Sequence, residues 1–227
     1  MALDALTRLQ VAASRLFFSL PQSAGFAVAG GAALLAQGLI DRPTQDVDLF
    51  LLDATASAVA TAAASFEAAV DRQGWSHRRA IDQRDFVRLE ISDDQERLII
   101  DLGRDSPAEE AIDTTELGPT LGPRDLAARK TLALFGRAEA RDYADVYDLA
   151  SRYGRDQLLT WAAADDAGFD RRVFASMLSA IERLTDEDLP VPAERVCALR
   201  AYFGAWAAEL AKPDDLHEPN EDPHGQD

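Results

Sequence analysis

Apolar residues recur at helical spacing in some segments of the chain and near every second position in others. Residues 3–20 carry an apolar stripe at helical spacing, which predicts an amphipathic helix that ends at Pro21. The alanine-rich segment 54–73 has a similar spacing, and Gly74, a residue type that commonly terminates helices, follows it. Both segments are therefore predicted to be helices.

A strand–helix–strand unit is predicted between these two helices. Phe26–Ala29 is a short apolar strand, a Gly-Gly pair follows it, and an apolar helix continues to about Leu39. A turn at residues 41–43 leads to a second strand that starts with Asp46. The other predictions are organised around this unit because it carries most of the candidate chemistry.

The spacing of apolar residues changes towards two after the second helix. Residues 75–81, 86–91 and 96–102 are predicted strands, and residues 93–94 join the last two in a hairpin. Proline and glycine are frequent in residues 104–122, which predicts a loop or a short crossing segment.

Helical spacing returns beyond this segment. Five helices are predicted, at residues 124–136, 141–153, 156–167, 171–184 and 192–211. The pattern predicts an α/β N-terminal domain followed by a helical C-terminal one. The expected boundaries are 1–118 for the first domain, 119–211 for the second and 212–227 for a disordered acidic tail.

The chain is strongly acidic, with a formal net charge of −17. Proteins that bind nucleic acid non-specifically present a basic face, so this charge argues against extended contact with nucleic acid. A local basic patch is compatible with it, and the candidates are Arg78, Arg79, Arg84 and Arg88. The single Cys197 fits a reducing compartment, and no apolar run reaches the ~20 residues of a membrane span. A cytoplasmic protein without membrane contact is expected.

The strand–helix–strand unit combines a carboxylate pair with a glycine turn. Side chains alternate along a strand, so Asp46 and Asp48 are expected to project from one side, within reach of a common cation. Gly30 and Gly31 stand where a strand leads into a helix, where free backbone N–H groups favour an anion. The missing side chains let a phosphate approach closely. The unit therefore predicts a metal site beside a phosphate site.

A third carboxylate, Asp101, lies in the otherwise apolar strand 96–102. A carboxylate inside an apolar strand is costly unless it is paired or binds a cation. Two interpretations remain open at this point. Asp101 is either a further metal ligand or the exposed end of its strand, next to residues 103–105.

A second group of charged residues lies in the helical region. Lys130 stands on an apolar helical stripe, where a lysine either extends to solvent or is held in an anion site. Asp142 and Asp145 are three residues apart and share one face of the next helix. They either complete a site with Lys130, or Asp142 caps its helix while Asp145 pairs with Arg141 or Arg152 at the surface.

Taken in order, these motifs resemble the polymerase-β-like nucleotidyltransferase superfamily. The resemblance rests on the Gly30-Gly31 pair, on the segment Arg42-Pro-Thr-Gln-Asp-Val-Asp48, and on the block from Lys130 to Asp145. Within the superfamily the motifs are most similar to the AbiEii/AbiGii toxin-type nucleotidyltransferases. Many superfamily members have Gly-Ser where this chain has Gly-Gly, so a serine contact to phosphate is absent here.

The resemblance implies a fold and a metal site. The expected fold is α+β, with a polymerase-β-like mixed sheet that is flanked by helices and followed by a C-terminal helical bundle. Asp46, Asp48 and Asp101 would be the ligands of Mg²⁺, a hard cation that suits carboxylate oxygens. Gly30 and Gly31 would contact the nucleotide.

The resemblance also assigns roles to residues outside the carboxylate strand. Lys130 would contact the phosphates of the nucleotide. Asp142 and Asp145 would position this lysine or act as a base. Arg42 and Thr44, just ahead of the metal strand, would hold the triphosphate or the base.

The implied activity is Mg²⁺-dependent transfer of a nucleoside monophosphate from an NTP to an acceptor hydroxyl. The implied acceptor is RNA, specifically tRNA, and the implied biology is a toxin that a partner antitoxin neutralises. Two other functions remain open. The acidic charge suits a nucleotidyltransferase that acts on a small cationic acceptor, as antibiotic-modifying members of the superfamily do. The fold is also compatible with a non-catalytic binding partner.

Overall fold

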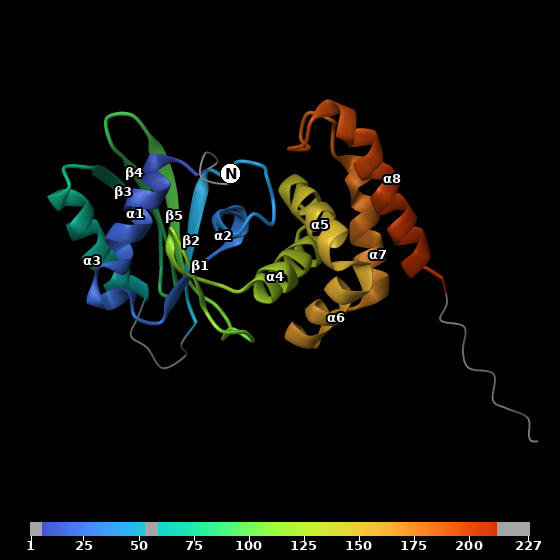
Figure 1. The fold of residues 1–227 in the computed structure, drawn as a ribbon, viewed down its shortest axis with the longest axis horizontal. Helices are drawn as coiled ribbons and strands as arrows, with labels where there is room; N and C mark the ends of the chain where they lie inside the picture. The colour runs from blue at the N-terminus through green and yellow to red at the C-terminus, as the bar shows by residue number, and fades with distance from the viewer. Residues whose placement is uncertain (1–5, 53–58, 213–227) are drawn as a thin grey trace, which may run out of the picture.

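A seven-stranded mixed sheet forms the centre of the N-terminal part of the protein (Figure 1). The computed structural model describes residues 6–52 and 59–212. The strands are β1 (Phe26–Ala29), β2 (Asp46–Leu51), β3 (Ser76–Gln83), β4 (Phe86–Ser92), β5 (Arg97–Arg104), β6 (Asp113–Thr115) and β7 (Gly118–Thr120). Their order in the sheet is β3-β4-β5-β2-β1-β7-β6. The pairs β2–β5 and β1–β7 are parallel, and the other pairs are antiparallel.

Helices pack on both faces of this sheet. α1 (Arg8–Phe18) and α3 (Val59–Arg72) pack on one face, whereas the short α2 (Gly30–Ala36) packs on the other, next to β1 and β2. Thr7 starts α1 with a capping box, which satisfies two backbone N–H groups at the helix end. The 3-10 turn η1 (Pro21–Ser23) connects α1 to β1.

Strict alternation along β2 and β4 separates an apolar face of the sheet from a polar one. Val47, Leu49 and Leu51 of β2 are buried, and the residues between them are partly exposed. Val87 and Leu89 are the equivalent buried positions of β4. The period of two thus directs the polar side chains of both strands to the face opposite α1 and α3.

Five helices and a 3-10 turn form the C-terminal part. They are α4 (Pro123–Gly136), α5 (Ala140–Tyr153), α6 (Arg155–Asp165), α7 (Arg171–Ser179), η2 (Ala180–Arg183) and α8 (Ala193–Leu210). Aromatic rings pack edge to face in this bundle, including Phe174 against Trp206 and Tyr143 against Phe203. All four of these side chains are buried.

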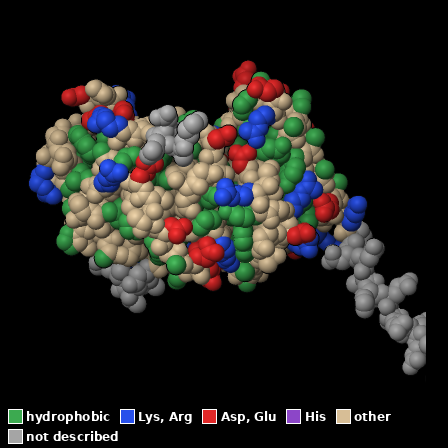
Figure 2. All heavy atoms as spheres, viewed as in Figure 1, with side chains coloured by type: hydrophobic (Ala, Val, Ile, Leu, Met, Phe, Trp, Pro, Cys, Tyr) green, Lys and Arg blue, Asp and Glu red, His purple; other side chains and the backbone are tan. Residues whose placement is uncertain are grey.

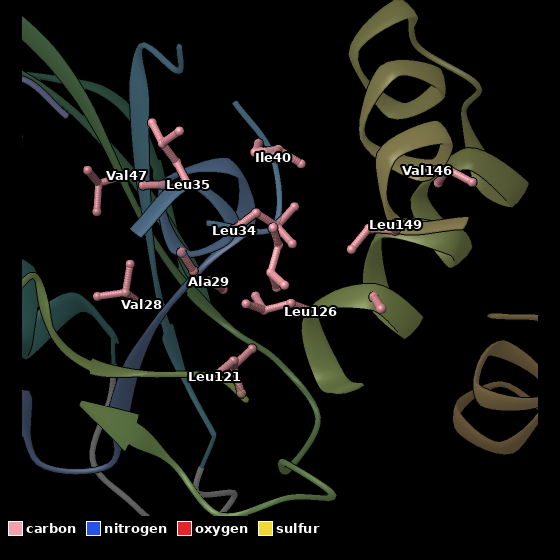
Figure 3. Close-up of a cluster of buried hydrophobic side chains, with 14 of the residues drawn as sticks. Val28, Ala29, Leu34, Leu35, Ile40, Val47, Leu121, Leu126, Val146 and Leu149 are labelled. Carbon is pink, nitrogen blue, oxygen red and sulfur yellow. The ribbon is translucent and has the colours of Figure 1, made fainter. Parts of the chain in front are cut away.

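The two parts share one continuous hydrophobic core. Figure 3 shows Leu34 of α2 lying next to Leu126 of α4, with Leu149 of α5 close by. α2 therefore fills the space between the sheet and the helices, and it holds α4 against the polar face of the sheet. The position of α4 determines which helical side chains face the carboxylates of β2.

The predicted fold class is confirmed: a mixed sheet is flanked by helices and followed by C-terminal helices. The prediction of a loop or a short crossing segment over 104–122 is wrong for residues 113–120, because these contain the strands β6 and β7, and β7 pairs with β1. β7 is only three residues long and includes Gly118 and Pro119, so it shows no alternation that a sequence pattern would detect. The sheet therefore extends past residue 118, and we propose a domain boundary just after β7.

Three predicted segments lie partly or wholly outside the described residues. These are the start of the first helix, residues 54–58 of the second helix, and the acidic tail beyond residue 212. Within residues 6–52 and 59–212, no helix combines the length and apolarity that crossing a bilayer requires.

Candidate active site

Three carboxylates lie together on the polar face of the sheet. Asp48 of β2 and Asp101 of β5 are directly paired in register, and Asp46 stands two residues before Asp48 on the same face. All three line a cleft of about 350 Å³ between the sheet, α2 and α4. Asp101 is buried in the middle of its strand, so it is not the exposed strand end that was the alternative interpretation.

Gly30 makes room for the Asp48 carboxylate. Its φ is +61°, a left-handed conformation that residues with a Cβ rarely adopt, and a Cβ there would lie 1.7 Å from Asp48 Oδ2. A Cβ on Gly31 would lie 2.9 Å from Thr44 Oγ1. The two glycines therefore permit close packing of the side chains that surround the carboxylates, in addition to lining the cleft.

Replacing Gly30 with alanine is expected to destabilise the fold more than replacing Gly38, which serves as the matched control. Gly38 has a φ of +63°, but nothing lies within 4 Å of its added Cβ. Gly38→Ala should lose only the ~1–2 kcal/mol cost of the left-handed backbone. Gly30→Ala should lose about 1–3 kcal/mol more, because the methyl group must displace Asp48. Urea unfolding measures both losses, and equal values would contradict the proposed crowding.

Two arginines and a threonine contact the carboxylates of Asp101 and Asp46. Arg88 of β4 donates two hydrogen bonds to Asp101, at 2.7 and 2.6 Å. Arg141 of α5 lies 3.2 Å from Asp46 Oδ2, and the Thr44 hydroxyl donates to Asp46 Oδ1 at 2.6 Å. Asp101 thus has a cationic partner from a neighbouring strand, and Asp46 has one from the helical part.

Asp48 differs from its two neighbours because it has no hydrogen bond or ion pair within the described part of the chain. Burial on the cleft floor, together with the charges of Asp46 and Asp101, raises its pKa from the ordinary 3.8 to about 7. Lys130 and Arg141 oppose this rise. A carboxylate with so high a pKa is one that a bound cation would stabilise in its ionised form.

The carboxylate group fits a divalent cation by its chemistry. Oxygen donors from three carboxylates suit a hard ion such as Mg²⁺, and Asp48 is the donor that lacks a protein partner. Among residues 6–52 and 59–212, however, no cluster of three or more acidic, histidine or cysteine side chains is already arranged to hold a metal ion. Arg88 and Arg141 occupy oxygens of Asp101 and Asp46 instead.

A buried ion network stands on the helical side of the cleft. Lys130 of α4 lies 3.0 Å from Asp145 and 3.4 Å from Asp142, both on α5 and both fully buried. Arg42 donates two hydrogen bonds to Asp145, at 2.6 and 2.7 Å. Asp145 therefore binds a lysine of its own part and an arginine of the sheet-containing part. Its partner is not Arg141 or Arg152, as the surface alternative supposed.

Asp142 has two functions in this network. It accepts hydrogen bonds from Arg137 and Lys130, and it also accepts one from the backbone N–H of Glu139, which completes a capping box at the start of α5. Burial alone would raise the pKa of Asp142, but the hydrogen bonds and charges of Arg137 and Lys130 outweigh burial and lower it. Asp142 is therefore ionised at neutral pH and holds Lys130 in place.

The cleft is more cationic than the protein as a whole. Its lining includes six cationic side chains (Arg42, Arg88, Arg129, Lys130, Arg137 and Arg141) and four acidic ones (Asp46, Asp48, Asp101 and Asp105). The sequence-based candidates Gly30, Gly31, Arg42, Thr44 and Lys130 all line it as well, whereas Asp142 and Asp145 lie behind Lys130 and do not.

Several lining residues were not predicted as site residues. Arg129 comes from α4, Arg137 caps the C-terminal end of α4, and Arg141 comes from the start of α5. Phe50 and Phe86 come from the strands β2 and β4. Arg137 and Arg141 lie within the block from Lys130 to Asp145, and this position in the chain was a usable signal. No local pattern indicated the two phenylalanines, because their proximity depends on the pairing of separate strands.

The basic patch expected from four arginines is largely neutralised. Arg78 pairs with Glu90, Arg79 pairs with Glu67, and Arg88 pairs with Asp101. Figure 2 shows acidic and basic side chains interspersed over the face in view. Of the four candidates, Arg88 alone lines the cleft, where its partner is Asp101.

Solved structures with a similar fold come from Helicobacter pylori. The chain matches JHP933 with a TM-score of 0.51 and 18% identity, covering 90% of this chain and 93% of that one. It also matches a second H. pylori protein, one proposed to be a nucleotidyltransferase, with a TM-score of 0.51 and 16% identity, covering 90% and 97% of the two chains. At this identity the likeness establishes the fold. No protein of curated function matches the chain.

The sequence itself establishes the family. Residues 15–223 match the family described as nucleotidyl transferase AbiEii toxin of type IV toxin–antitoxin systems. This range includes the carboxylate strand, Lys130 and both buried aspartates of α5, so the match and the cleft agree. The protein is a nucleotidyltransferase, and it belongs to the AbiEii family of toxins from type IV toxin–antitoxin systems.

Proposed function

We propose that the protein transfers a nucleoside monophosphate from an NTP to a hydroxyl group of RNA, with tRNA as the expected acceptor and Mg²⁺ as the cofactor. The observation that supports this proposal is that carboxylates of the sheet and cations of the helical part line the same cleft. Asp46, Asp48 and Asp101 lie on the sheet, and Lys130 and Arg137 approach from α4 and its C-terminal end. A triphosphate and the cation that it requires carry charges that match this arrangement.

The carboxylates would hold the metal ion, and each has a separate position in this set. Asp48 would be the central ligand, since it has no partner within the described residues. Asp101 and Asp46 would contribute oxygens that Arg88 and Arg141 contact in this structure. A bound divalent cation would supply charge neutralisation on the triphosphate and activation of the acceptor hydroxyl.

The cations of the helical part would bind the phosphates. Lys130 extends into the cleft with its ammonium group held by Asp142 and Asp145, so its position does not depend on the substrate. Arg137 is 45% exposed and Arg141 is 41% exposed, and both line the cleft. Arg137 binds Asp142 and Arg141 binds Asp46 in this structure, and their exposed guanidinium groups would exchange part of these contacts for phosphate oxygens, which arginine binds in bidentate fashion.

Asp142 and Asp145 would act as positioning residues. The alternatives left by the sequence were positioning of the lysine or base catalysis. Both side chains are fully buried and lie behind Lys130, away from the cleft. A base must come within hydrogen-bond reach of the proton that it removes. We therefore propose that Asp142 and Asp145 position Lys130. Arg42 would align Asp145 through its hydrogen bonds, and Thr44 would align Asp46.

The six cationic side chains that line the cleft are paired with carboxylates in this structure, and the phosphates of an anionic acceptor would take the place of some of these partners. A small cationic acceptor would suit the acidic surface, but it would meet six cationic and four acidic side chains inside the cleft. RNA presents phosphates, which this lining attracts. Because the family belongs to toxin–antitoxin systems, we also propose a protein antitoxin as a partner.

The proposal is tested by incubating the protein with each of the four α-labelled NTPs, Mg²⁺ and total tRNA. Label is expected to enter RNA with one or more of the nucleotides and to be abolished by EDTA. Label on a small cationic acceptor alone would support the antibiotic-modifying alternative. Metal-dependent NTP binding without any transfer would support the non-catalytic alternative and contradict the proposed activity.

A further inference from the structure

The polar face of the sheet is organised in rows that run across β2, β5 and β4. Residues in register form the rows Asp46–Ile99–Glu90, Asp48–Asp101–Arg88 and Phe50–Gly103–Phe86. Successive rows are two residues apart, so all three point to the same face. The third row contains two aromatic residues and a glycine immediately beside the carboxylates, and the activity proposed above does not use it.

Phe50 and Phe86 lean over Gly103 from both sides. A Cβ on Gly103 would lie 3.1 Å from Phe50 Cε1 and 3.3 Å from Phe86 Cδ2, so the rings occupy the space that a side chain would take. Gly103 is buried beneath them, whereas both rings are partly exposed and line the cleft. We call this pair the aromatic floor. It is an apolar surface in a cleft whose other walls are mostly charged.

A cation accompanies the aromatic floor. The Arg88 guanidinium lies 6.0 Å from the centre of the Phe86 ring, while its nitrogens bind Asp101. The floor is therefore attached to the carboxylate row through Arg88. Because Arg88 lies over the Phe86 ring, a flat ligand at this end of the cleft would contact an aromatic ring and a planar cation together, and nucleobases stack on both kinds of group.

The aromatic floor lies at the end of the cleft away from Arg141. Arg141 contacts Asp46, the first carboxylate row, whereas Phe50 stands two residues beyond Asp48 on the other side. The carboxylates thus lie between Arg141 at one end of the cleft and the aromatic floor with Arg88 at the other. A nucleotide with its phosphates among the cations, or an acceptor strand that enters from the opposite end, would bring a base over the floor.

We propose that Phe50 and Phe86 form a stacking site for a nucleobase, either that of the NTP or that of the terminal nucleotide of the acceptor. This inference rests on the proposed function and adds to it the group that binds the base. Stacking on a phenyl ring requires no particular hydrogen-bonding edge, so the site tolerates different bases. The floor contributes binding and orientation, and neither ring exchanges a proton with the substrate.

The test compares Phe86→Leu with wild type, and Phe18→Leu is the control. Leucine keeps an apolar side chain but removes the aromatic face, and Phe18 is a partly exposed phenylalanine outside the cleft. Equilibrium binding of ATP, GTP, CTP and UTP is measured beside binding of inorganic tripolyphosphate. For a site that binds the base of the NTP, Phe86→Leu should weaken nucleotide binding by about 5- to 100-fold and leave tripolyphosphate binding unchanged.

Gly103→Ala provides a second variant that leaves both rings in the chain. The φ of Gly103 is not left-handed, so alanine at this position causes no backbone strain. The new methyl group would displace the rings of Phe50 and Phe86 by a few tenths of an ångström. Loss of nucleotide binding in the same direction as Phe86→Leu is expected. Circular dichroism and thermal unfolding of each variant establish that the fold is retained.

The two sources of the base give different results. Unchanged NTP binding with a raised KM for tRNA in the transfer assay supports a site for the acceptor base. If folded Phe86→Leu and Gly103→Ala change neither NTP binding nor the KM for tRNA, the inference is overturned, and the rings serve only to cover Gly103. Absence of transfer by the wild type, with nucleotide binding that depends on Phe86, would reject the proposed function and retain the stacking site.

Discussion

Asp48→Asn is expected to reduce nucleotidyl transfer by about three orders of magnitude or more. The substitution keeps the size of the side chain but removes the one carboxylate of the cleft lining that has no partner among the described residues. Metal ions supply several kcal/mol of transition-state stabilisation, and ~4 kcal/mol corresponds to about a thousandfold in rate. Incorporation of α-labelled nucleotide into tRNA measures the loss. A variant with more than a tenth of wild-type activity would remove Asp48 from the proposed metal site.

The same variant should gain stability relative to wild type as the pH rises in EDTA. The pKa of Asp48 is about 7 in the folded protein and near its ordinary 3.8 in the unfolded chain. The folded wild type therefore retains a proton that the unfolded chain has lost, and its stability falls as the pH rises from about 4 to about 7. Asparagine has no such proton. Above pH 7 the variant should be more stable by roughly 2–4 kcal/mol, since water in the cleft screens part of the effect.

Thermal unfolding at pH 5 and pH 8 separates this result from a general change in stability. The difference between variant and wild type should be larger at pH 8 than at pH 5. Addition of Mg²⁺ at pH 8 should stabilise the wild type more than the variant, because a ligand that binds only the folded state raises its stability. A difference that is equal at the two pH values would show that Asp48 titrates normally.

Asp145→Ala is expected to lower the free energy of unfolding by about 3–5 kcal/mol. Asp145 is fully buried and pairs with Arg42 and Lys130, so its removal leaves two cations with one partner fewer in the interior. An unpaired buried charge is far more costly than a lost surface ion pair. The contact with Arg42 also joins the two parts of the protein, so the geometry of the cleft should be lost with it.

Urea unfolding compares this variant with Asp186→Ala. Asp186 also accepts from an arginine, Arg200, but its side chain is 72% exposed, and Arg200 keeps hydrogen bonds to two backbone carbonyls. The control should lose at most about 1 kcal/mol. Similar losses in the two variants would mean that the Asp145 network is not the strong interdomain contact that its burial indicates.

Local patterns were sufficient for most of the elements and for part of the site. Alternation along one strand determines that Asp46 and Asp48 share a face, whatever the strand pairs with. A three-residue separation on a helix determines that Asp142 and Asp145 share a face. The order of the glycines, the carboxylates, Lys130 and the aspartates was sufficient to indicate the family that the sequence match shows.

These local patterns could not predict which distant segments of the chain pair with one another. Periodicity does not reveal the register that places Asp101 opposite Asp48, or that lines up Phe50, Gly103 and Phe86. A shift of one residue would direct these side chains to the other face, and only the packing of the whole sheet excludes it. The strand β7 was missed for the same reason, since it is defined by its contact with β1.

The sequence by itself determined most of the elements, the shared faces of the two aspartate pairs and the family. The tertiary structure decided that Asp145 binds Arg42 across 103 positions of the chain, that Arg88 contacts Asp101, and that six cationic side chains line one cleft of an acidic protein. The physical reason is the range of the interactions. Side-chain periodicity is a property of one segment, whereas ion pairs and strand register depend on how the hydrophobic core brings separate segments together.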